Sequence, residues 1–153
     1  MAVYFCDSSA IVKCYVQEQG SVWMVTLLDA TAGHHLYLAR ITGVEVIAAI
    51  RRRARRGDIA APDAAAALAQ FRQDFAGLYR IIEITPAFLT RAMALAETHA
   101  LRGYDAVQLA AAVEVNIRGA TLGLPVLTLV SADGELNVAA ASEGLVVEDP
   151  SMH

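Results

Sequence analysis

The feature that most constrains this chain is a short apolar run at its start that ends abruptly on an acid. Val3–Cys6 is apolar, and Asp7, Ser8 and Ser9 follow it directly. An apolar run of this length between polar residues is typical of a fully buried strand. Ligands bind at the carboxyl ends of the strands in open α/β sheets, so an acid here is well placed for chemistry. Taken alone, Asp7 is more simply explained as the cap of the next helix.

The composition indicates one globular domain. The chain has 153 residues, 56% of them hydrophobic and spread throughout, which is enough to bury a core without disulfides or metals. No apolar run reaches the roughly 18 residues of a membrane span, and no signal peptide is recognisable. We therefore expect a cytoplasmic protein. Cys6 and Cys14 lack the paired spacing of a zinc site.

Positive charge is local in this chain. The formal net charge of −4 argues mildly against a nucleic-acid binder, but five of the twelve Lys and Arg residues lie within residues 51–56. On a helix, Arg52, Arg55 and Arg56 could share one face and contact RNA phosphates or an acidic segment of a partner. A solvated face that complements the helix dipole is an equally good explanation.

Apolar periodicity and turn residues divide the chain into alternating strands and helices. The predicted strands cover residues 3–6, 35–39, 80–84, 124–130 and 145–147. The predicted helices cover residues 9–17, 21–32, 42–56, 62–77, 85–100, 104–118 and 133–143. This alternation implies an α/β three-layer sandwich, with a parallel sheet of about four to five strands and helices on both faces. We expect one domain over residues 1–148 and a frayed tail over 149–153.

Three more acids occupy positions comparable to that of Asp7. Asp133 follows the strand that ends at Val130, and Asp105 begins a helix. Glu45 lies in the apolar face of the helix over residues 42–56, where a buried carboxylate costs several kcal/mol unless it is paired. Each has a structural alternative, because Asp105 and Asp133 could be N-caps and Glu45 could form a surface ion pair.

Four carboxylates directed at one crevice would repel each other, and a shared divalent cation would remove that conflict. Magnesium and manganese prefer such oxygen ligands. A site of this kind can generate a hydroxide nucleophile and stabilise an in-line displacement at phosphorus.

These residues resemble the PIN domain, most closely the small bacterial VapC-type toxins. The matching segments are Val3–Ala10, Thr42–Val46 with its Glu45, Leu101–Ala110 and Ser131–Leu136. The most specific is the Tyr-Asp-Ala-x-x-Leu-Ala block that begins at Tyr104. The resemblance covers nearly the whole chain. It implies a Rossmann-like sheet and a magnesium- or manganese-dependent ribonuclease.

The resemblance also implies which residues form the site. The catalytic and metal-binding acids would be Asp7, Glu45, Asp105 and Asp133, with Asp7 and Asp105 the firmest ligands. Ser8, Ser9 and Ser131 match polar positions beside the site, where a hydroxyl could hold a metal-bound water or an acid, or could cap a helix. Asn137 lies one helical turn past Asp133 and is a further candidate next to the ligands.

VapC-type proteins commonly form homodimers and are inhibited by an antitoxin whose tail lies along the groove near the acids. Tyr15, Val22, Trp23 and Leu27 could supply an apolar docking surface for such a partner, although large apolar residues more often pack the core.

Three other functions fit the sequence less well. A phosphoacceptor signalling domain also uses acids at strand ends but needs a lysine near its pocket, and the single lysine, Lys13, lies within the first predicted helix. A non-catalytic PIN scaffold would bind a partner without cleaving RNA, and the intact acids argue against it. A phosphatase of the Asp-x-Asp type is disfavoured, because Ser9 stands where the second Asp would be.

Overall fold

The chain folds around a five-stranded sheet in which every pairing is parallel. The computed structural model describes all 153 residues. The strands are β1 (Val3–Cys6), β2 (His35–Ala39), β3 (Arg80–Ile82), β4 (Leu127–Val130) and β5 (Val146–Glu148). Their order is β3-β2-β1-β4-β5, so the first strand is the central one. The predicted parallel α/β architecture is confirmed.

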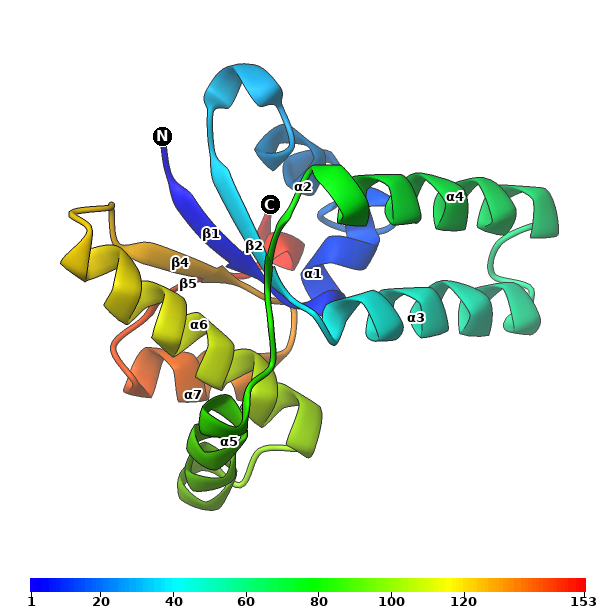
Figure 1. The fold of residues 1–153 in the computed structure, drawn as a ribbon. Coiled ribbons are helices and arrows are strands. Elements are labelled where there is room, and N and C mark those ends of the chain that lie inside the picture. Colours follow the sequence, from blue (N-terminus) through cyan, green and yellow to red (C-terminus); the bar gives the residue numbers. More distant parts are fainter.

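Helices cover both faces of this sheet (Figure 1). The first group consists of α1 (Ser8–Ile11), α2 (Ser21–Leu27), α3 (Thr42–Arg56) and α4 (Ala61–Gly77). The second consists of α5 (Pro86–His99), α6 (Gly103–Thr121) and α7 (Gly134–Ser142). In Figure 1, α3 and α4 lie side by side and extend beyond the sheet, while α5, α6 and α7 gather below it. None of the helices is both long and apolar enough to cross a membrane.

The strands divide their side chains between two cores. In β1, Val3 and Phe5 join the cluster formed with α5, α6 and α7, whereas Cys6 joins the cluster formed with α1 to α4. In β2, Leu38 and Ala39 separate in the same way. Successive side chains of a strand point to opposite faces, so a strand covered on both faces must be apolar at every position.

The strand order creates a switch point beside β1. The chain forms β2 and β3 on one side of β1 and then crosses to form β4 and β5 on the other side. Asp7 follows β1, and Ser131 follows β4, so both begin at the same edge of the sheet. Ligand sites in open α/β sheets form at such switch points.

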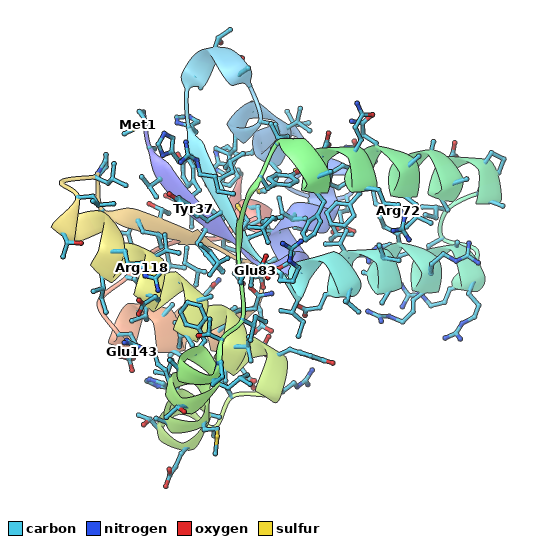
Figure 2. The ribbon with its side chains drawn as sticks, viewed as in Figure 1. Met1, Tyr37, Arg72, Glu83, Arg118 and Glu143 are labelled. Atoms are coloured by element: carbon cyan, nitrogen blue, oxygen red, sulfur yellow. The ribbon has the colours of Figure 1, made fainter.

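An ion pair links the ends of β2 and β3. Glu83, which follows β3, pairs with Arg40, which follows β2 close to the start of α3 (Figure 2).

Several of the predicted helices and strands are longer than the observed ones. The helix predicted over 9–17 is the short α1 followed by a 3-10 turn, Val12–Cys14. The helix predicted over 21–32 ends at Leu27, because the side chain of Asp29 accepts a hydrogen bond from Thr31 N and starts a separate turn. Strand β4 begins only at Leu127, two residues after Pro125, which has no N–H for the sheet.

The C-terminal tail, which we expected to be frayed over residues 149–153, makes several contacts in this structure. Pro150–Met152 forms a 3-10 turn with Pro150 buried. The ring of His153 stacks on Trp23, with centroids 4.2 Å apart and an interplanar angle of 3°. Gln19 Nε2 donates to the Ser151 carbonyl at 2.6 Å. These contacts are made with residues more than a hundred positions earlier, which local sequence patterns do not reveal.

Candidate active site

Asp7 is the most firmly held carboxylate of the site. It caps α1, its Oδ1 accepts from Ala10 N at 3.0 Å, and the residue is only 3% exposed. Ser9 Oγ donates to the same oxygen at 2.7 Å, and Ser131 Oγ donates to Oδ2 at 3.0 Å. Burial raises the pKa of Asp7 to about 7, although these three hydrogen bonds act in the opposite direction. Capping and site formation are therefore two roles of one side chain.

The serines join the ends of β1 and β4. Ser9 Oγ accepts a hydrogen bond from Ala132 N at 2.9 Å while it donates to Asp7. Ser131 Oγ accepts from Asp133 N at 3.0 Å while it donates to the other oxygen of Asp7. Each hydroxyl uses both its donor and its acceptor, so the two strand ends and the carboxylate are fixed relative to one another.

Glu45 is held by a residue that the sequence did not single out. Gln108 Nε2 donates to Glu45 Oε1 at 2.7 Å and to Thr42 Oγ1 at 2.9 Å, and Ser8 Oγ donates to Glu45 Oε2 at 3.2 Å. Burial raises the pKa of Glu45 above its ordinary value. Gln108 is 1% exposed and lies one helical turn after Asp105. This i, i+3 spacing within α6 was the signal that could have identified it.

Asp105 and Asp133 differ in how they are held. Asp133 is the N-cap of α7, and its Oδ1 accepts from Glu135 N at 3.0 Å and Leu136 N at 3.2 Å. Asp105 is not a cap, because Arg102 occupies that position of α6, and its carboxylate accepts no hydrogen bond. The pKa of Asp105 is raised to about 6 by burial and then by the charges of Asp133 and Glu45. The charges of Asp133 and Glu45 therefore disfavour the ionised form of Asp105.

Asn137 supports the end of β4 from α7. Its Nδ2 donates to the Ser131 carbonyl at 2.8 Å, whereas its Oδ1 is buried without a partner. Gln108 Oε1 is likewise buried and unpaired. Buried polar atoms usually have partners, so both oxygens are available to a water molecule or a ligand at this end of the sheet.

The donor set suits a hard divalent cation. Its members are carboxylate oxygens, with serine hydroxyls and amide oxygens nearby, which are the ligand types that magnesium and manganese prefer. No three His, Cys, Asp or Glu side chains form a group that could hold a metal ion as they stand. Mutually repelling carboxylates are expected to stay apart without a cation, and magnesium needs only one or two of them because it retains several waters.

A model of the PIN domain matches residues 4–141. The chain belongs to the PIN-domain family. It is 35% identical to Ribonuclease VapC45 of Mycobacterium tuberculosis over 142 residues, which span 93% of this chain and 91% of that relative. This degree of identity across nearly the full length places the PIN domain described here among the VapC-type proteins.

Solved structures share the fold of this PIN domain. VapC20 of Mycobacterium tuberculosis, a toxin that cleaves the sarcin–ricin loop, superposes with a TM-score of 0.61 at 17% identity, covering 94% of this chain and 96% of its own. VapBC2 of Rickettsia felis, bound to a DNA fragment from their promoter, gives a TM-score of 0.61 at 14% identity, covering 96% and 98% of the two chains. At these identities the likeness shows the fold.

A groove of this PIN domain is lined by one of the four acids, Glu45, and by two of the arginines. It has a volume of about 440 Å³, with Ser8, Ser9 and Glu45 at one end and Arg52 and Arg53 at the other. Arg53 is ion-paired with Glu18 at 3.1 Å, whereas Arg52 has no acidic partner. Only part of the arginine cluster is therefore free to meet a ligand from this groove.

The remaining arginines of the cluster point elsewhere. Arg51, Arg52 and Arg55 line a second hollow, also of about 440 Å³, beside Ala61 at the start of α4. Arg56 is ion-paired with the exposed Asp58 at 2.9 Å. Of the three arginines predicted to share a face, Arg52 and Arg55 are thus unpaired and Arg56 is engaged at the surface.

The four apolar residues considered for docking are mostly occupied within the fold. Leu27 is buried, Trp23 stacks on His153, and the hydroxyl of Tyr15 donates to Asp74 at 2.7 Å. Only Val22 is well exposed. Core packing, the plainer of the two explanations, accounts for most of this set.

Lys13 is unsuited to the signalling role considered above. It is 7% exposed, and its Nζ is paired with Glu18 Oε1 at 3.2 Å. A phosphoacceptor domain needs its lysine free to contact the incoming phosphoryl group, and here the ammonium is already engaged.

Proposed function

We propose that this protein is a magnesium- or manganese-dependent ribonuclease that hydrolyses phosphodiester bonds within RNA and acts as the toxin of a toxin–antitoxin pair. One observation carries the proposal. Asp7, Glu45, Asp105 and Asp133 belong to four separate elements, Asp7 directly follows the central strand at the switch point of the sheet, and the chain is 35% identical to a ribonuclease. Like charges near one another are costly, above all where one of them, Asp7, is buried, so these acids at a ligand-binding edge of the sheet favour a chemical use for them.

The carboxylates would hold the metal, with Asp7 and Asp105 as ligands and Glu45 and Asp133 beside them. A bound divalent cation supplies Lewis acidity at the phosphate and lowers the pKa of a coordinated water. The chain's own polar side chains orient the acids: Ser9 and Ser131 fix Asp7, and Gln108 and Ser8 fix Glu45. Such supporting contacts keep a metal site in its working geometry.

Glu45 is suited to take up a proton during hydrolysis. Its pKa is raised by burial, so its basicity is closer to that of a general base at neutral pH than an exposed glutamate's. In the reaction, the oxygen of water bonds to phosphorus, the bond from phosphorus to the ribose oxygen breaks, and the leaving ribose oxygen gains a proton. Glu45 would accept the proton that the attacking water loses.

Arg52 and Arg55 would bind phosphates of the RNA backbone away from the cleaved bond. Both are exposed and free of acidic partners, and Arg52 lines the groove that contains Glu45. Arg56 would join them after releasing Asp58, since a surface ion pair contributes only about 0–1 kcal/mol. Contacts of this kind give affinity that falls with salt and does not depend on sequence.

The proposal includes protein partners and a location. The Rickettsia felis structure holds VapBC2 on DNA from their promoter, which supports a cognate antitoxin for this chain. We further expect a homodimer and a cytoplasmic location. A groove of about 690 Å³ between α3 and α4 offers Phe71, Phe75 and Ile47, with Arg40 and Arg72 at its edge. Its charge suits an acidic, partly apolar partner segment. Figure 2 labels Arg72 on α4.

The decisive experiment is cleavage of total RNA by the purified protein, followed by mapping of the new ends. Cleavage should require magnesium or manganese, stop with a chelator and be lost in Asp105→Asn. Asp63→Asn is the matched control, because Asp63 is an exposed aspartate on α4 and should leave cleavage unchanged. Equal cleavage by wild type and Asp105→Asn, or cleavage that persists in chelator, would exclude the proposed mechanism.

A further inference from the structure

Tyr104 differs from the other tyrosines of the chain in having no partner. Of the five, Tyr4 packs against His34, Tyr15 bonds to Asp74 and Tyr79, and Tyr37 lies under Arg80. Tyr104 is 60% exposed, its hydroxyl makes no hydrogen bond, and its ring meets no other aromatic ring or cation. A single exposed aromatic residue is not unusual by itself, so its surroundings decide its meaning.

Those surroundings are the candidate active site. Tyr104 is the second residue of α6 and directly precedes Asp105. It lines the groove of about 440 Å³ together with Ser8, Ser9 and Glu45. The one unpartnered tyrosine therefore lines the same groove as Glu45 and is the chain neighbour of Asp105.

The rest of the groove is lined by apolar side chains and by arginine. Around Glu45 and on towards Arg52, α3 contributes the small or apolar residues Val44, Ala48 and Ala49 to the lining, and Val44 is 68% exposed. Arg52 follows at the far end without an acidic partner. An aromatic face, an apolar strip and a free guanidinium match the base, the sugar and the phosphate of a nucleotide chain. An ion or a free phosphate would use only the last of them.

Building on the proposed ribonuclease function, we infer that Tyr104 stacks on an unpaired base beside the phosphate that is cleaved, and so positions single-stranded RNA in this groove. A base inside a duplex is already stacked on both faces, whereas an unpaired base is free to lie on an aromatic side chain. Stacking of this kind accepts any base, because each has a π-face. Tyr104 thereby selects for unpaired RNA rather than for a base sequence.

The test uses an oligonucleotide that spans a site cut by this protein in total RNA. KM and kcat are measured for wild type, Tyr104→Phe, Tyr104→Leu and Tyr104→Ala. Leu and Ala should raise KM about 5- to 100-fold with kcat little changed, whereas Phe should behave as wild type because it keeps the ring. Leu122→Ala is the control. Leu122 is an exposed apolar residue (75%) at the C-terminal end of α6, roughly 27 Å from Tyr104 at 1.5 Å per helical residue.

An abasic substitution at each nucleotide in turn sharpens this result. At one position near the cut, removal of the base should raise the wild-type KM and abolish the difference between wild type and Tyr104→Leu. The inference is overturned if Leu and wild type share the same KM, if kcat alone falls, if Phe fails to rescue, or if only binding of a protein partner changes. Those outcomes leave cleavage by the wild type intact. The absence of any metal-dependent cleavage would instead remove the proposed function, and this inference with it.

Discussion

Asp7 and Asp105 are two carboxylates of the candidate site that are held in opposite ways. Asp7 is 3% exposed and accepts hydrogen bonds from Ser9, Ser131 and the backbone of Ala10. Asp105 is half-buried and accepts none. The pKa of each is raised above its ordinary value, and burial is the largest cause in both. What differs is the number of hydrogen bonds that the two carboxylates accept.

The difference indicates a division between support and ligand binding. The contacts of Asp7 join the end of β1 to the end of β4 and the start of α1, so its carboxylate is part of the fold. Asp105 is positioned only by the helix that carries it, and its oxygens are left for a ligand. A site built in this way combines one rigid anchor with one free acid, and each can be tested separately.

The largest expected effect is on RNA cleavage. Asp7→Asn and Asp105→Asn should each lower kcat/KM at least 100-fold, because both would remove a proposed metal ligand. In the metal-free protein, the two variants should differ in their free energy of unfolding. At neutral pH, Asp105→Asn should not lower the free energy of unfolding, since no hydrogen bond is lost and the charge whose burial and repulsion raise the pKa of Asp105 is removed. A large loss of stability in Asp105→Asn, measured by urea unfolding in chelator, would contradict the division between anchor and free acid.

The next largest effect is the pH dependence of stability. The folded pKa of Asp7, about 7, lies above the ordinary value of 3.8, so the folded state holds this proton more tightly than the unfolded state does. The resulting stabilisation is complete below pH 3.8 and is lost as the pH rises through 7. From 1.36 kcal/mol per pKa unit, the total is on the order of 4 kcal/mol. Urea unfolding of the metal-free protein across this range measures it.

Two controls accompany that measurement. Asp7→Asn should flatten the curve between pH 4 and 7, because residue 7 can no longer be charged. Added magnesium should raise the unfolding midpoint more at pH 8 than at pH 5, since a cation stabilises the ionised carboxylates. A curve that Asp7→Asn does not alter would mean that another group is responsible.

Gln108 allows the same comparison at Glu45. Gln108→Leu removes the donor to Glu45 Oε1 and Thr42 Oγ1 without emptying the space, and should lower kcat/KM about 10- to 100-fold. Gln70→Leu is the matched control, because Gln70 is exposed on α4 and bonds only to Asp74. Similar kinetics in the two variants would show that Glu45 needs no support from Gln108.

The smallest effect should separate two neighbouring serines. Ser9→Ala leaves Ala132 N without a partner and leaves Oδ1 of Asp7 with only the N–H of Ala10, and it should cost about 1–3 kcal/mol of stability. Ser8→Ala removes one 3.2 Å contact to the partly exposed Glu45 and should cost about 0.5–1.5 kcal/mol. Thermal unfolding of the two variants measures the difference. If the Ser8 variant is the less stable of the two, Glu45 rather than Asp7 depends more strongly on its serine for the stability of the fold.

The amino-acid sequence by itself determined the alternation of strands and helices and the residues that punctuate it. It also indicated which acids are informative, because Asp7, Asp133 and Glu45 can be recognised from strand ends, caps and an interrupted apolar face. These signals are local. They arise from backbone geometry and from hydrogen bonds within a few residues, so they can be read without knowledge of the rest of the fold.

Only the tertiary structure decided how those residues are used. It brought Gln108 to Glu45, Ser131 to Asp7 and His153 to Trp23 across 63, 124 and 130 positions of the chain respectively, and it left Tyr104 without a partner. Such relations depend on the sheet order and on which helix covers which face, so no short pattern contains them. The position of Asp7 at the end of a strand can thus be read from the sequence. Its burial depends on the neighbouring strand β4, which pairs with β1 and is followed by Ser131, the donor to Asp7.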